Sequence, residues 1–192
     1  MRTCGLPDGP CYRRRTVLGL ALTPLLAAAA PADEAVSPAR MPPQPDDRFV
    51  FLTGPKKQQI VRIEELPLDG PQVQAYPISP DGTIRNESLL NLVILARFDP
   101  AELAEETRLR AADGVVAYSA VCTHQGCPVN MWSKDHDAFV CSCHGSVYDP
   151  KKGAEVLAGP APRPLPALGL KVADGAVAVA SPFSARVGGT LK

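Results

Sequence analysis

Cysteine and histidine residues gather in two short segments of this chain, and both residue types are metal ligands. Four of the six cysteines lie within 22 residues of one another, a clustering that indicates a site rather than a general disulfide framework. The segments read Cys122-Thr123-His124-Gln125-Gly126-Cys127 and Cys141-Ser142-Cys143-His144-Gly145-Ser146. Two thiolates and two imidazoles could hold one zinc ion or an iron–sulfur cluster. Structural zinc usually uses C-x2–4-C spacing, so the C-x-H spacing of the first segment favours iron.

The two segments resemble the paired boxes of the Rieske iron–sulfur family, C-T-H-x-G-C and C-x-C-H-G-S. The resemblance implies one 2Fe–2S cluster, with Cys122 and Cys141 on one iron and His124 and His144 on the other. Two ferric ions, two sulfides and two thiolates sum to zero, so the oxidised core is neutral and easier to reduce than an all-cysteine cluster. Rieske potentials accordingly lie at about −150 to +300 mV, against roughly −400 mV for plant-type ferredoxins.

The same resemblance implies roles for residues around the two boxes. In its high-potential branch, Cys127 and Cys143 would form a disulfide that ties the cluster loops together, and such bonds persist outside the cytoplasm. The hydroxyl of Ser146 would donate to a bridging sulfide and that of Tyr148 to the sulfur of Cys122, which raises the potential. A third loop of the family covers the cluster and excludes water. It corresponds here to Gly159, Pro160, Ala161 and Pro162.

The N-terminus has the layout of an export signal. Basic residues precede an apolar run from Val17 to Ala30, as in signal segments, and Arg14-Arg15 ahead of that run resembles the twin-arginine signal. We therefore expect residues 1–32 to direct export to the periplasmic side. The segment is either cleaved near Ala30-Pro31-Ala32 or retained, with residues 16–30 as an inner-membrane anchor.

The rest of the chain is expected to form a proline-rich linker, residues 33–48, and a Rieske 2Fe–2S domain, residues 49–192. Apolar alternation and β-branched residues predict strands, over residues 49–53, 59–63, 72–78, 89–98, 115–121, 138–141, 170–173 and 176–180. Asp99-Pro100 with Glu102 predicts a capped helix that runs to about Ala112, and Asp174-Gly175 predicts a hairpin. The expected fold is all-β, an antiparallel β sandwich with one short helix and a cluster-binding subdomain of two loops.

The predicted function is one-electron transfer by a redox subunit rather than by a stand-alone enzyme. The formal charge is zero, and no basic face indicates nucleic-acid binding. One interpretation is a bc-type quinol:cytochrome c oxidoreductase, with membrane cytochrome b and c subunits as partners, cytochrome c as acceptor, and quinol docking at His144 or His124. The alternative is the small subunit of an arsenite-oxidase-like enzyme, which relays electrons from a large molybdenum subunit. Residues 116–119 resemble that subunit, and Gln125 is polar where bc-type proteins usually carry an apolar residue.

Overall fold

The computed structural model describes residues 36–189, so the expected signal or anchor in residues 1–32 lies outside the described residues. Within the described part, the named strands all pair antiparallel, and the only α-helix there is one turn long, which confirms the all-β prediction. None of the helices in residues 36–189 is long and apolar enough to cross a membrane. The elements are β1 (Arg48–Phe51), β2 (Val73–Ile78), β3 (Val93–Arg97), α1 (Glu105–Arg108), β4 (Val115–Ser119), β5 (Val129–Ser133), β6 (Ala138–Cys141), β7 (Ser146–Asp149), β8 (Glu155–Ala158), β9 (Ala167–Ala173) and β10 (Ala176–Ser181).

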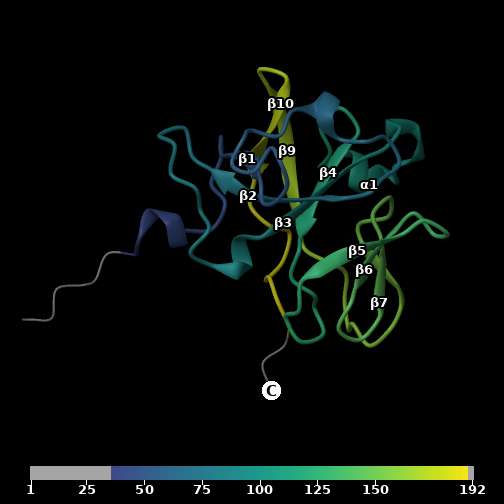
Figure 1. The fold of residues 1–192 in the computed structure, drawn as a ribbon. Helices are drawn as coiled ribbons and strands as arrows, with labels where there is room; N and C mark the ends of the chain where they lie inside the picture. The colour runs from purple at the N-terminus through teal and green to yellow at the C-terminus, as the bar shows by residue number, and fades with distance from the viewer. Residues whose placement is uncertain (1–35, 190–192) are drawn as a thin grey trace, which may run out of the picture. The chain divides into compact units, whose positions relative to one another are not determined.

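The strands form two sheets, one of six strands in the order β1-β2-β3-β4-β9-β10 and one of four in the order β5-β6-β7-β8. Figure 1 shows the smaller sheet, in green, beside the larger one. The two outer strands of the larger sheet also meet. The backbone of Asp46 donates to Val179 at 2.9 Å, and Val179 donates to Asp47 at 2.8 Å. These bonds join the start of β1 to β10, so the larger sheet curls towards a closed barrel.

Strands β3 and β4 are buried on both faces, which explains the unbroken apolar run of β3. Val93 and Leu95 point into a core enclosed by the larger sheet. Ile94 and Ala96 point into a second core, which also contains Phe139 and other side chains of the smaller sheet. The second core therefore fixes the smaller sheet to the larger one, and with it the loops that carry the predicted ligands.

The helix expected from Asp99 to Ala112 is wrong in its extent. Asp99 does cap a first turn, Pro100–Glu102, but this is a 3-10 turn, and the chain becomes extended at Leu103 before α1 begins. Leu103 is 4 % exposed and lies in the second core. Glu102 pairs with Lys151 at 2.5 Å instead of reaching back to the cap. Burial of one leucine between the two turns thus interrupts the helix.

The strand expected over residues 59–63 is also wrong, since only isolated bridges at Ile60 and Arg62 form there. Three strands were not expected from the sequence, namely β5, β7 and β8. All three belong to the smaller sheet, and they pair with β6 or with each other.

The proline-rich segment before β1 is held against the domain within its described residues. The carboxylate of Asp47, 0 % exposed, accepts two bonds from the guanidinium of Arg85 at 2.6 and 3.1 Å. Arg85 also donates to the carbonyl of Pro38 at 2.8 Å, and the Asn91 amide donates to that of Met41 at 2.8 Å. These bonds fasten Pro38, Met41 and Asp47 to the domain.

Candidate metal centre

Both boxes form tight loops closed by equivalent hydrogen bonds. The backbone N–H of Gly126 donates to the carbonyl of Cys122 at 2.9 Å, and that of Gly145 donates to Cys141 at 3.0 Å. Both glycines have a positive φ, 78° and 70°, which glycine adopts without the steric cost of a side chain. The first loop follows β4, and the second joins β6 to β7. The glycine four residues after each cysteine is therefore required to bend the box.

The structure brings the predicted ligands together in two pairs, the two cysteines with each other and the two histidines with each other. Cys122 and Cys141 are free of disulfides and only 1 % exposed. The rings of His124 and His144 lie with their centroids 4.7 Å apart. His124 is half-buried and His144 is exposed. Two sulfurs inside and two imidazoles outside suit a dinuclear centre whose irons take different ligand types.

The two thiols differ in their electrostatic surroundings. Burial acts to raise the pKa of Cys122, but hydrogen bonds, first among them that of the Tyr148 hydroxyl, bring the pKa below its ordinary value. Burial raises the pKa of Cys141, and the nearby sulfur of Cys122 adds to the effect. Two buried thiolates side by side repel each other, so a cation between them is needed for both to lose their protons. Iron bound by both sulfurs supplies that positive charge.

Two buried polar atoms at the site, the Nδ1 of His124 and the hydroxyl of Ser146, have no geometrically defined hydrogen-bond partner among residues 36–189. Buried polar atoms are almost always paired, so both atoms point to a ligand. A 2Fe–2S cluster offers an iron to the imidazole nitrogen and a sulfide to the hydroxyl. The cluster would thus account for both atoms, so the residues present fit it.

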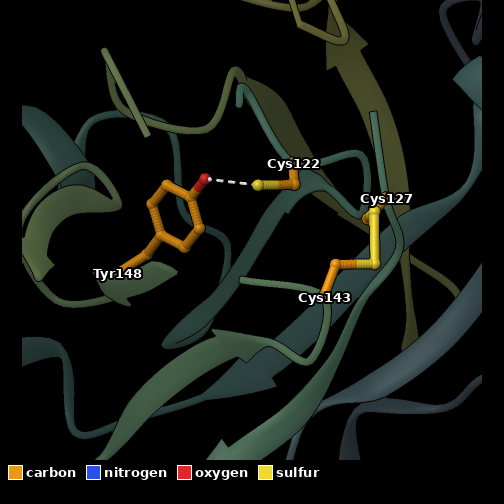
Figure 2. The surroundings of a disulfide bond; sticks show 4 residues. All are labelled: Cys122, Cys127, Cys143 and Tyr148. Atoms are coloured by element: carbon orange, nitrogen blue, oxygen red, sulfur yellow. Dashed lines mark hydrogen bonds between the residues drawn. A yellow bond between two sulfur atoms is a disulfide. The ribbon is translucent and has the colours of Figure 1, made fainter. Parts of the chain in front are cut away.

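Tyr148 contacts the predicted ligand Cys122 directly. Its hydroxyl lies 3.2 Å from the Cys122 sulfur, and Figure 2 marks this contact with a dashed line. The side chain is 0 % exposed, and burial raises its pKa. The hydroxyl therefore keeps its proton and is the donor to a thiolate. The contact expected between this tyrosine and the first cysteine is present.

The predicted disulfide is confirmed, since Cys127 and Cys143 are bonded with their Cα atoms 6.4 Å apart. The bond joins the end of the first box to the second box (Figure 2). The sulfurs of these two residues and of Cys141 lie within 4.8 Å of one another. Because two of the three are bonded to each other, the group does not form a separate metal site.

The loop that begins at Gly159 lies against the second box. Gly159 has φ +89°, and a Cβ there would lie 2.6 Å from the Cα of Ser146, so only glycine allows this approach. The next residues of the loop lead to Arg163, whose carbonyl accepts a bond from the Thr123 hydroxyl at 2.7 Å. The loop therefore touches both boxes. Sequence reasoning missed Thr123 and Arg163 as residues that join them.

A groove of about 1120 Å³ runs beside the first box. His124 and Gln125 form part of its wall, and two arginines, Arg40 and Arg186, also line it. Its other walls are mostly apolar and include Leu89, Leu90, Phe183 and Val187. Such a surface suits a flat apolar molecule or the apolar side chains of a partner protein.

Comparison with known proteins agrees with this geometry. A family model described as a Rieske [2Fe-2S] domain matches residues 100–170. The chain is 35 % identical over 95 residues to the cytochrome bc1 complex Rieske iron–sulfur subunit of Streptomyces lividans, covering 49 % of this chain and 56 % of that protein. It is 35 % identical over 129 residues to a Haloferax mediterranei protein named as a respiratory nitrate reductase Rieske subunit, covering 66 % and 56 %. The chain thus spans about half the length of these curated relatives.

Among solved structures, the chain is similar to the cyanobacterial plasma membrane Rieske protein of Synechocystis PCC 6803. The two are 29 % identical, with a TM-score of 0.35, over 55 % of this chain and 84 % of the other.

Proposed function

We propose that this chain is the iron–sulfur subunit of a bc-type quinol:cytochrome c oxidoreductase. Residues 100–170 form a Rieske [2Fe-2S] domain, which binds a 2Fe–2S cluster. The observation that carries the proposal is the order of the ligands. The cysteines lie inside, and the imidazoles lie on the outer side of the centre. When bound, the cluster accepts and releases one electron at a time.

The residues of the chain support this role in distinct ways. Cys122 and Cys141 would hold the inner iron, and the buried Nδ1 of His124 is placed to hold the outer one. That leaves Nε2 of His124 free for a hydrogen bond with a quinol. His144 is the more exposed imidazole and offers a second docking point. The groove beside His124 supplies an apolar surface for a quinol ring.

A second candidate is an electron relay in another membrane-associated or periplasmic oxidoreductase, such as an arsenite-oxidase-like molybdenum enzyme. Gln125 is exposed at the tip of the first box, where a polar residue suits a protein partner better than an apolar quinone pocket. The similarity to the Haloferax protein also spans more of this chain than the similarity to the Streptomyces subunit. In this role the exposed face around His144 would receive electrons from a large subunit and pass them to a cytochrome.

Both candidates place the domain outside the cytoplasm. The pair Arg14-Arg15 ahead of an apolar run supports export by the twin-arginine route, which would carry the folded, cluster-loaded domain. The disulfide between Cys127 and Cys143 supports an oxidising compartment as well. We propose that the partners are membrane subunits on the periplasmic side.

The test is purification of the tagged full chain with its partners from gently solubilised membranes. Haem b in the complex, and reduction of the cluster by added quinol, are expected for the bc-type role. A molybdenum subunit without haem b would replace that role with the relay. Stoichiometric zinc without iron would refute both.

A further inference from the structure

The segment Arg186–Gly189, the C-terminal strap, lies directly on the first box. A Cβ on Gly189 would lie 2.7 Å from the carbonyl oxygen of His124 and 3.2 Å from the Cα of Gln125. Gly188 is buried and packs near Leu90 and Val121. The absence of side chains at these glycines therefore lets the strap pack directly against the backbone of the first box.

Arg163 holds the strap in this position. Its Nη2 donates to the carbonyl of Arg186 at 2.8 Å and to that of Gly188 at 2.5 Å. Within residues 36–189 no carboxylate forms a salt bridge with Arg163. Its Nη1 is buried and has no hydrogen-bond partner in the described part of the chain. The guanidinium thus donates to two neutral carbonyls of the strap and does not serve in a salt bridge with a described carboxylate.

The same residue holds the first box from its other side. The carbonyl of Arg163 accepts the hydroxyl hydrogen of Thr123 at 2.7 Å, and Thr123 adjoins the tyrosine that contacts Cys122. The first box is therefore held on one side by the bond between the Thr123 hydroxyl and the Arg163 carbonyl, and on the other side by the strap. The second box has four consecutive exposed residues, 142–145. This difference matches the exposure of the two imidazoles, since His124 is half-buried and His144 is exposed.

We propose that Arg163 is a positioning residue that fastens the C-terminal strap over the first box and thereby restrains the backbone that carries His124. The inference goes beyond the proposed function, because it concerns the cluster site itself and holds whichever complex the chain serves.

The test is the rate at which diethyl pyrocarbonate modifies each imidazole in the full chain with its cluster loaded and oxidised. The chain has three histidines, so peptide mass mapping follows each one, with His144 and His136 as internal references. Arg163→Met should raise the His124 rate relative to His144 about threefold or more, because loss of the two bonds lets the strap open locally. Arg163→Lys keeps a cationic donor and should restore most of the original ratio. Arg108→Met makes the same chemical change on an exposed side chain of α1 and should leave the ratio unchanged.

Gly189→Ala provides a second variant that leaves Arg163 intact. Its added Cβ has no room against the carbonyl of His124, so the strap should lift and the His124 ratio should rise as well. An unchanged ratio in cluster-loaded Arg163→Met would overturn the proposal. So would an equal rise at all three histidines, which would indicate general loosening. If Arg163→Met does not load its cluster, Gly189→Ala decides: a selective rise at His124 supports the proposal, and no change overturns it.

Discussion

Replacing Tyr148 by phenylalanine should lower the reduction potential of the cluster without removing the cluster. The hydroxyl lies 3.2 Å from the Cys122 sulfur and does not coordinate iron, so assembly should survive. Reduction adds negative charge to the centre, and a donor to one of its sulfurs stabilises the reduced state more than the oxidised state. We take the reduced state to lose about 1–1.5 kcal/mol more than the oxidised state, a difference the size of a typical net hydrogen bond. For one electron, with a tenfold change equal to 59 mV, this corresponds to roughly 40–65 mV.

The packing around the ring makes this substitution a clean one. Tyr148 is 0 % exposed, and phenylalanine keeps the ring in place. The Thr123 hydroxyl, 3.4 Å from the lost oxygen, keeps its bond to the carbonyl of Arg163. The bond to Cys122 and two long contacts at 3.4 Å, with the Thr123 N–H and with the Thr123 hydroxyl, disappear.

Tyr118 offers a matched control, because it is equally buried and its hydroxyl donates to the carbonyl of Pro150 at 2.9 Å. Protein-film voltammetry of Tyr148→Phe and Tyr118→Phe should show a lowered potential in the first and an unchanged one in the second. Ser146→Ala should lower the potential as well, and the double variant of Tyr148 and Ser146 should shift by about the sum if the two bonds act independently. An unchanged potential in Tyr148→Phe, with full iron content, would refute the reasoning.

Other expectations can be checked separately. Purified domain should contain two irons and two acid-labile sulfides per chain and show a Rieske-type EPR signal once reduced; zinc alone would contradict this. Cys127→Ala or Cys143→Ala should still assemble a cluster but lose about 2–5 kcal/mol of stability, measured by denaturant unfolding, and free thiols in the exported wild-type protein would exclude the bond. Gly159→Ala should reduce cluster retention, because its Cβ has no room against the second box, as iron release under mild chelation would show. Arg14→Lys with Arg15→Lys should block export; undiminished export would exclude the twin-arginine route.

The cluster site could be predicted from the sequence because its chemistry is local. The predicted ligands lie in two short boxes, and each box is closed by a bond from a glycine to the cysteine four residues earlier. The contact of Tyr148 with Cys122 could be predicted for the same reason, since Tyr148 follows the second box on β7. The assignment of residues 1–32 remains a prediction, as those residues lie outside the described part of the chain.

The parts that could not be predicted depend on contacts between distant residues. Strand β5 has mostly polar or exposed positions, and it forms because it pairs with β6. The helix after Asp99 is interrupted because Leu103 is buried in the second core. The capping pattern around Asp99 is local and does not indicate that burial. The bond between Thr123 and Arg163 joins positions 40 residues apart. No pattern within either segment signals it.

The unequal support of the two boxes has a consequence for partner recognition. The first box is held by the disulfide, by Thr123 and by the C-terminal strap, so its backbone has little freedom to adapt to a partner. The second box is held by the disulfide and by the contact with Gly159, and its residues 142–145 remain exposed. A partner that approaches the outer side of the centre therefore meets His144 on an open loop and His124 on a restrained wall of the groove. Substitution at the exposed Ser142 should thus affect electron exchange with the partner more than cluster assembly, whereas substitution at the buried Thr123 should do the reverse.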